Sequence, residues 1–185
     1  MKIDITKTNK KYSIIYADPP WAYLWGKGET GGNFCPEKHY KTMSTVEICE
    51  LGNYIKKIRE KNCALFIWTT MPCLKDVFQV IEAWGFKYKT CAFTWIKTKK
   101  DGTPLSGMGS YTKANAELCL LAMRGHIKSV DKTVPQVLMH PRLGHSVKPD
   151  EIMRRIERLF GNERTKIELF ARRKVSGWDR WGDEA

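Results

Sequence analysis

The chain has 185 residues, which is enough for one domain with a substantial core and too few for two comfortable ones, so we expect a single domain over residues 1–185. The formal net charge of +12 attracts polyanions, but many basic proteins bind none, so charge alone assigns no function. The six cysteines contain no Cys-x-x-Cys pair, the N-terminus has no apolar signal core, and no apolar run reaches membrane-spanning length. Secreted and membrane classes are therefore disfavoured, and we expect a cytoplasmic protein with reduced thiols.

The first predicted element is a buried strand over residues 12–17 that stops at Asp18, Pro19, Pro20 and Trp21. This places a carboxylate at the carboxyl end of a strand, where open α/β sheets bind ligands. Two prolines give a stiff turn whose carbonyls can only accept hydrogen bonds, and Trp21 offers a flat face on which a base can stack. The alternative is an ordinary proline turn beside a core tryptophan.

The next segment, residues 26–33, is rich in glycine and is predicted to be a loop. Ser44 and Glu47 form the pattern of a capping box at the start of an amphipathic helix that runs to about residue 60. Residues 63–69 read as a buried strand. A second helix is predicted from Pro72 to Trp84, with a stop at Gly85, and a long strand over 86–96 follows.

Residues 97–113 show almost no apolar periodicity and are predicted to be a loop. Its lysines either line a groove for a phosphate backbone or form a solvated linker. A strand over 115–123, a helix from Pro149 to about Gly161 and a strand over 166–171 complete the pattern. The alternation predicts an α/β fold with a mostly parallel sheet covered by helices on both faces. The G-x-G-x-x-G spacing at residues 26–31 lies in a predicted loop and does not lead directly from a strand into a helix, as a dinucleotide-binding turn does, which disfavours an ordinary nicotinamide or flavin enzyme.

The Asp18–Trp21 motif resembles the catalytic motif of the mRNA adenosine methyltransferase 70 kDa subunit-like family. Other segments resemble the same family in the same order along nearly the whole chain: 39–44, 64–69, 115–121, 145–151, 166–172 and 177–182. The resemblance implies a Rossmann-like methyltransferase fold with a circularly permuted order, in which the catalytic strand comes first and the cofactor strands come last. It also implies transfer of a methyl group from S-adenosylmethionine to the exocyclic amino group (N6) of adenine.

For catalysis, the resemblance assigns the motif Asp18, Pro19, Pro20 and Trp21. The Asp18 carboxylate and the Pro19 carbonyl are the expected acceptors for the two amine hydrogens. Because a paired base is out of reach, we expect a flipped or single-stranded substrate, with Trp21 and Tyr40 as stacking candidates.

For the cofactor, the resemblance carries over Asp18, Ser146, Lys148, Phe170, Arg172, Asp183 and Glu184. Lys148 has the strongest physical case because it precedes a predicted helix N-terminus, although a solvated surface lysine remains the alternative. The family commonly has Asn after the final Trp-Gly, whereas this chain has Asp183 and Glu184, which accept but do not donate hydrogen bonds.

Glu117 matches a position that the family places beside the target adenine. As a carboxylate in an apolar strand it needs a partner, so a buried ion pair is the alternative. The four histidines are too scattered for a metal triad, and we expect no metal site.

The sequence therefore predicts an adenine N6-methyltransferase whose partner is a nucleic acid. DNA is favoured over RNA because the chain lacks the appended domains of the eukaryotic RNA enzymes. The alternatives are an RNA adenosine methyltransferase and a catalytically inactive relative that binds nucleic acid beside an active partner. A homodimer or a second subunit is also compatible with the sequence.

Overall fold

The computed structural model describes residues 1–22, 41–105, 107, 111–142 and 147–182. The strands are β1 (Tyr12–Ala17), β2 (Arg59–Thr69), β3 (Lys87–Thr98), β4 (Ala116–Arg124), β5 (Val137–Pro141), β6 (Lys166–Leu169) and β7 (Asp179–Trp181). The helices are α1 (Thr45–Glu50), α2 (Gly52–Ile58), α3 (Leu74–Ala83) and α4 (Asp150–Phe160), with a 3₁₀ turn η2 at Met71–Cys73.

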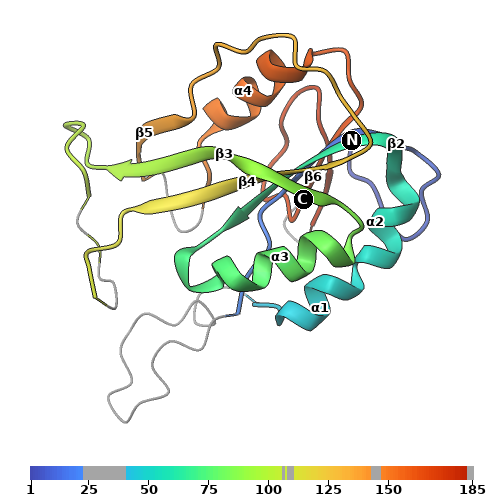
Figure 1. The fold of residues 1–185 in the computed structure, drawn as a ribbon, viewed down its shortest axis with the longest axis horizontal. Coiled ribbons are helices and arrows are strands. Elements are labelled where there is room, and N and C mark those ends of the chain that lie inside the picture. Colours follow the sequence, from blue (N-terminus) through green and yellow to red (C-terminus); the bar gives the residue numbers. More distant parts are fainter. Residues whose placement is uncertain (23–40, 106, 108–110, 143–146, 183–185) are drawn as a thin grey trace.

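The strands form one mixed sheet in the order β5-β3-β4-β2-β1-β6-β7 (Figure 1). β1 pairs in parallel with β2 and β6, β6 with β7, and β3 with β5, whereas β4 is antiparallel to both of its neighbours. The predicted α/β fold with a mostly parallel sheet is confirmed. The first strand in the chain lies between an early and a late strand, as the permuted order requires.

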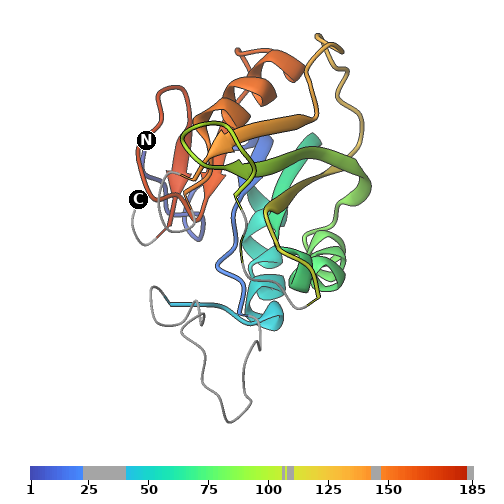
Figure 2. The same cartoon turned by 90° about the vertical axis from the view of Figure 1, so that its left-hand side faces the viewer.

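Helices cover both faces of the sheet, with α1, α2 and α3 on one side and α4 on the other (Figures 1 and 2). The period of two along β1 decides which side chain faces which layer. Ile15 and Ala17 belong to the core beneath α1–α3, whereas Ile14 and Tyr16 belong to the core beneath α4. A central strand that is apolar on both faces is thus buried along its whole length.

The helix predicted over 44–60 starts where expected, but it is divided into two helices. The Ser44 side chain accepts from the Glu47 amide and Glu47 reaches back to the Ser44 amide, which confirms the capping box. The helix then breaks at Leu51, which caps α1 and begins α2. A Cβ at Gly52 would lie 2.7 Å from the Ala83 carbonyl oxygen, so the break brings α2 against the end of α3. β2 begins at Arg59 and not at residue 63.

The other predicted elements agree with the structure to within a few residues. Pro72 lies in η2, and the helix ends before Gly85, whose φ of 74° suits a residue without a side chain. β3 extends to Thr98, two residues beyond its predicted end. The segment after it is a loop held by isolated bridges between Thr98 and Pro104 and between Gly107 and Ala114.

Two short strands were not expected from the sequence. β5 is an edge strand held from both sides, because it pairs with β3 and because buried Arg155 of α4 donates to the carbonyls of Pro135 and Val137 at 2.8 and 2.9 Å. β7 extends the sheet beside β6. The predicted loop at 26–33 lies outside the described residues.

No helix in the described part of the chain is long and apolar enough to cross a membrane. Five of the six cysteines lie in that part and all five are free thiols.

Candidate functional site

The Asp-Pro-Pro-Trp segment forms a braced corner after β1. The Trp21 amide donates to the Pro19 carbonyl at 2.9 Å, and the Met43 amide donates to the Pro20 carbonyl at 2.8 Å. The Ala22 amide returns a bond to the Met43 carbonyl at 2.9 Å. Because prolines carry no amide hydrogen, the corner presents acceptors only. The expectation of a stiff, donor-free turn at the end of a buried strand is met.

Trp21 does not have the free ring face that its predicted stacking role requires. Its side chain is 4% exposed, and its indole N–H donates to the Trp68 carbonyl at 3.0 Å. The ring therefore braces the corner from inside the core, which is the alternative that the sequence left open. The second stacking candidate, Tyr40, lies outside the described residues.

Four charged side chains of alternating sign run from β3 to the corner. Lys97 Nζ lies 2.5 Å from Glu117 Oε1, and Lys148 Nζ lies 3.2 Å from Glu117 Oε2 and 2.7 Å from Asp18 Oδ2. The Lys148 side chain is only 8% exposed, so it is not a solvated surface lysine. Its ammonium faces Asp18 and Glu117, and the ring of Trp68 lies 5.4 Å away. Glu117 forms buried ion pairs, which was the alternative to a role beside the adenine. Through Lys148, these pairs connect Glu117 to Asp18.

Burial and neighbouring charge set the protonation of this chain of groups. Burial raises the pKa of Asp18 above its ordinary value, which the Lys148 ammonium opposes and the Glu117 carboxylate reinforces. Burial also disfavours the charged forms of Glu117 and Lys148, but their ion pairs outweigh it. The pKa of Glu117 is lowered by Lys148 and Lys97, and the pKa of Lys148 is raised by Asp18 and Glu117. Glu117 and Lys148 are therefore charged at neutral pH, whereas Asp18 is the group closest to taking up a proton.

A pocket of about 180 Å³ opens beside the corner, between the carboxyl ends of β1 and β6 and the start of α4. It brings together four of the predicted site residues: Asp18, Lys148, Phe170 and Arg172. Phe170 has a φ of 60°, a left-handed conformation that is rare for an aromatic residue, and its ring packs edge-on against Trp181 with centroids 5.4 Å apart. Strained backbone of this kind is concentrated at ligand sites. Ser146, Asp183 and Glu184 lie outside the described residues.

The residues of the pocket fit S-adenosylmethionine in their chemistry. Its amino-acid part carries an ammonium and a carboxylate next to a sulfonium, so it needs acceptors and cations within one small space. The pocket supplies Asp18 and Glu168 as acidic groups and Lys148, Arg172 and Arg173 as basic groups. Its volume is below the roughly 300 Å³ at which pockets for whole drug-sized ligands begin, so the described walls suit part of the cofactor.

Three residues of this site were not found from the sequence: Lys97, Glu168 and Arg173. Trp95 lies opposite Glu117 in the ladder, which puts Lys97 two residues further along β3 and on the same side as Glu117. Glu168 lies opposite Tyr16 in the β1–β6 ladder. The period of two would have identified both residues only if the strand pairing and register had been known.

Comparison with known proteins agrees with this geometry. The family model MT-A70 matches residues 12–184. The chain is 34% identical to the Type II methyltransferase M.MunI of Mycoplasma sp, over 95% of the chain and 78% of that protein. It is 25% identical to the N(6)-adenosine-methyltransferase MT-A70-like protein of Arabidopsis thaliana, over 99% of the chain and 24% of that protein.

A third relative, the N6-methyladenosine RNA methyltransferase MTA1 of Pyricularia oryzae, is 24% identical over 94% of the chain and 46% of its own length. The chain thus spans less than half of each of these two longer relatives. The match over almost the whole chain, with the Asp-Pro-Pro-Trp corner beside a charged pocket, shows that this chain belongs to the MT-A70 family of S-adenosylmethionine-dependent methyltransferases.

Proposed function

We propose that this protein methylates the N6 amino group of adenine in DNA, with residues 1–185 acting as a single catalytic domain. The observation that carries the proposal is the bonding of Asp18. Lys148 donates to its Oδ2, and no hydrogen bond from the described residues reaches Oδ1. A carboxylate in the pocket wall, with one anchored oxygen and one that no described residue bonds, suits an incoming N–H donor.

The adenine amine is a poor nucleophile because its lone pair is delocalised into the ring. Acceptors on both amine hydrogens favour a tetrahedral nitrogen, which frees the lone pair for attack. Asp18 Oδ1 is the first acceptor. The second is the Pro19 carbonyl, which already receives the Trp21 amide but has another lone pair. Because the corner is braced on both sides, these acceptors are in place before the base arrives.

S-adenosylmethionine supplies the methyl group when bound. Lys148, Arg172 and the Phe170 backbone, together with Asp18, Ser146, Asp183 and Glu184, are proposed to hold the cofactor. The Lys148 ammonium also lowers the pKa of Asp18 against the effect of burial. Positioning of the two reactants then supplies much of the rate.

Glu117 is proposed to lie beside the target base, where its ion pairs with Lys97 and Lys148 fix its orientation. Lys99, Lys100 and Lys113 belong to the loop after β3, which projects beyond the sheet at the left of Figure 1. We propose that this loop contacts the phosphate backbone of the flipped or single strand. Tyr111, whose side chain is fully exposed there, presents a ring to that strand.

DNA is the proposed substrate because the relative with 34% identity is a Type II methyltransferase that the chain covers over 78% of its length. We propose that the enzyme acts in the cytoplasm, as a monomer, a homodimer or one of two subunits, which agrees with action on cellular DNA and with the five free thiols of the described residues. The RNA alternative is favoured by a different observation: two more distant relatives are named as adenosine or RNA methyltransferases.

The test measures transfer of labelled methyl groups to adenine-containing DNA and RNA oligonucleotides, single- and double-stranded, by the wild type and by Asp18→Ala. Glu82→Ala serves as the control, because Glu82 is an exposed carboxylate on α3, away from the pocket. We expect wild-type and Glu82→Ala enzymes to methylate DNA at N6, and Asp18→Ala to be at least about 100-fold slower.

Methyl transfer to RNA but not to DNA would show that the substrate is RNA and not the proposed DNA. Cofactor binding without transfer to any oligonucleotide would indicate the inactive relative. Normal activity in Asp18→Ala would overturn the role of the corner.

A further inference from the structure

One carboxyl group in the cofactor pocket, that of Glu168, has no bonded partner among the residues that the structure describes. Glu168 lies in β6 directly opposite Tyr16 of β1, so its side chain shares a sheet face with Tyr16 and, two residues on, with Asp18. All three line the pocket. No hydrogen bond or ion pair joins the Glu168 carboxyl group to any other residue in the described ranges, in contrast to the carboxyl groups of Asp18 and Glu117 in the same site.

The surroundings of Glu168 leave it short of positive charge. From β1 it faces Asp18, and from the first turn of α4 it faces Asp150, both of which are acidic. The Arg173 guanidinium lowers the pKa of Glu168, but it already donates to the Asp150 carboxylate and to the Lys148 carbonyl. The Lys148 ammonium is likewise engaged, with Asp18 and Glu117. Arg172 lines the same pocket, and its charge lowers the pKa of Asp18.

Burial, reinforced by Asp18, raises the pKa of Glu168 to about 7. A carboxyl group with this pKa is half protonated near neutral pH. The ion pairs around it are complete without it, so Glu168 has no evident role in holding the fold together. A cation placed beside it would draw off its proton.

We propose that Glu168 is the cofactor pocket's receptor for a cationic group of S-adenosylmethionine, and that the bound cofactor displaces a proton from this carboxyl to solvent. The inference rests on the cofactor of the family and not on the nucleic acid that is methylated. A protein that methylates RNA alone would contradict the proposed function and leave this inference intact.

Proton release gives a direct test by calorimetry. Binding of S-adenosylmethionine to the wild type is measured at pH 7 in two buffers of different ionisation enthalpy, such as phosphate and Tris. The difference in heat gives the number of protons released. We expect release in the wild type and in the Glu82→Gln control, and less than half of that release in Glu168→Gln.

Affinity should change with pH in the same way. The wild type should bind S-adenosylmethionine more tightly as the pH rises from 6 to 8. Glu168→Gln, which resembles the protonated carboxyl, should bind within about twofold of the wild type at pH 6 and about tenfold more weakly at pH 8. Glu168→Asp keeps the carboxyl and should recover part of the pH dependence. Thermal unfolding of each variant establishes that it is folded.

Two further ligands identify the group that Glu168 receives. S-adenosylhomocysteine keeps the ammonium and lacks the sulfonium, whereas 5′-methylthioadenosine lacks both charges. Proton release with both cofactor forms assigns the ammonium, and release with S-adenosylmethionine alone assigns the sulfonium. Equal release with 5′-methylthioadenosine would contradict the proposal.

Asp18 is the other carboxyl that could supply a proton, and Asp18→Asn separates the two. We expect this variant to retain most of the release. The proposal is overturned if Asp18→Asn abolishes the release while Glu168→Gln keeps it, or if Glu168→Gln loses affinity equally at pH 6 and pH 8.

Discussion

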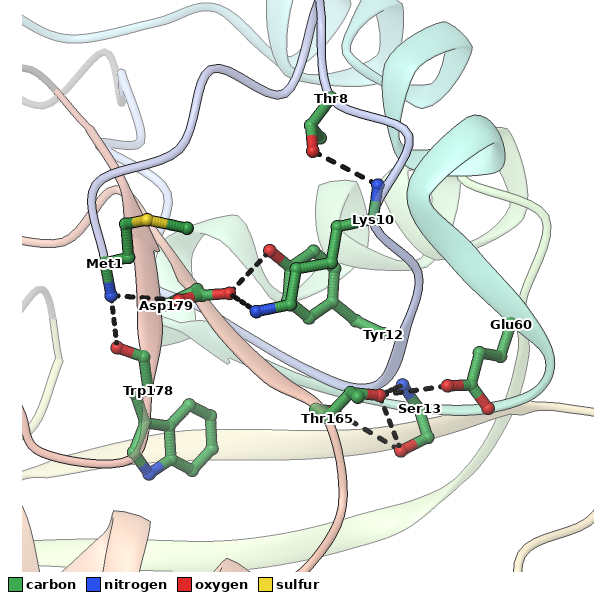
Figure 3. Close-up of polar contacts among 9 residues, drawn as sticks. All are labelled: Met1, Thr8, Lys10, Tyr12, Ser13, Glu60, Thr165, Trp178 and Asp179. Atoms are coloured by element: carbon green, nitrogen blue, oxygen red, sulfur yellow. Dashed lines mark hydrogen bonds and ion pairs between the residues drawn. The ribbon is translucent and has the colours of Figure 1, made fainter.

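A partly buried carboxylate lies beside a lysine near each end of β1, Asp179 of β7 at the amino end and Asp18 at the carboxyl end, and the two carboxylates differ in their bonding. At the amino end, Asp179 receives bonds from the Lys10 ammonium, the Tyr12 hydroxyl at 2.8 Å and the amino group of Met1 at 2.9 Å (Figure 3). At the carboxyl end, Asp18 receives one bond from Lys148 and has Glu117 and Glu168 as acidic neighbours.

The pKa of the two groups moves accordingly. Burial tends to raise the pKa of Asp179, but its donors outweigh burial and lower it. Burial wins at Asp18, and its pKa is raised. A carboxylate saturated with donors stabilises the fold, whereas one left short of donors has capacity for a ligand. The comparison explains why the same residue type is structural at one end of a strand and available for chemistry at the other.

The largest expected effect is on the rate of methyl transfer in Asp18→Asn. The amide keeps one acceptor oxygen but has no charge and replaces the other acceptor by a donor, so we expect a loss of about 100-fold or more in kcat with the melting temperature little changed. Single-turnover transfer to an adenine oligonucleotide measures the first quantity and thermal unfolding the second. A rate within a few-fold of the wild type would remove Asp18 from the chemistry.

Lys148→Met is expected to move the acid limb of the pH–rate profile. The Lys148 ammonium opposes the effect of burial on Asp18, so its removal raises the pKa of Asp18 further. At saturating cofactor we expect about tenfold lower transfer near pH 7 and partial recovery as the pH rises toward 9. Lys10→Met removes the equivalent lysine at Asp179 and should leave the profile unchanged. The same shift of the pH–rate profile in both variants would show that Lys148 has no specific effect on the catalytic carboxylate.

Asp179→Asn should affect stability without affecting the chemistry. It leaves the Lys10 and Tyr12 donors with a poorer acceptor, so we expect the free energy of unfolding to fall by about 2 kcal/mol while kcat is kept. Because the folded pKa of Asp179 is lowered below 3.8, its contribution is complete above that pH and is lost as the pH falls through the folded value. Urea unfolding of the wild type and Asp179→Asn from pH 3 to pH 7 should show that the difference in their unfolding free energies becomes smaller as the pH falls.

A smaller effect of opposite sign is expected for Glu168→Gln. The folded pKa of Glu168 is raised from 4.5 to about 7, so the wild type loses stability as the pH rises through that window. We expect the variant to gain about 1 kcal/mol in unfolding free energy at pH 8 and nothing near pH 4.5, after allowing for the solvent contact of this side chain. A loss of stability at pH 8 would mean that Glu168 has a structural partner.

The smallest effect concerns the lysines of the loop after β3. Lys99→Gln with Lys100→Gln should weaken DNA binding at low salt and reduce the slope of log affinity against log salt by about 1 to 2, with no effect on cofactor affinity. Fluorescence anisotropy over a salt series measures both quantities. An unchanged slope would mean that the loop does not contact phosphates and is a solvated linker.

The fold was largely predictable because its signals are local. The capping box at Ser44, the stop at Gly85 and the apolar run before Asp18 each depend on a few adjacent residues, and each appears in the structure. The short strands β5 and β7 have no such local signal, because they exist only through pairing with β3 and β6.

Site residues that belong to a sequence motif were predictable. Site residues that come together only through strand pairing or tertiary contacts were not. Asp18 and Lys148 share a pocket with Phe170 and Arg172, as expected. The contact of Lys148 with Glu117 joins residues from α4's leading segment and β4, and no spacing in the sequence encodes it. The sequence also did not show that Trp21 is buried, with its indole N–H bonded to the carbonyl of Trp68, which follows it by 47 positions.

The most direct test of the comparison is a carbon-13 NMR titration of the carboxyl groups of Asp18 and Asp179, assigned with Asp18→Asn and Asp179→Asn. The donors around each group predict that Asp179 titrates below its ordinary value of 3.8 and Asp18 above it. Addition of an adenine oligonucleotide should then perturb the Asp18 signal and leave that of Asp179 unchanged. Equal pKa values for the two groups, or a pKa of Asp18 below that of Asp179, would contradict the claim that Asp18 is available to accept a hydrogen bond from the substrate.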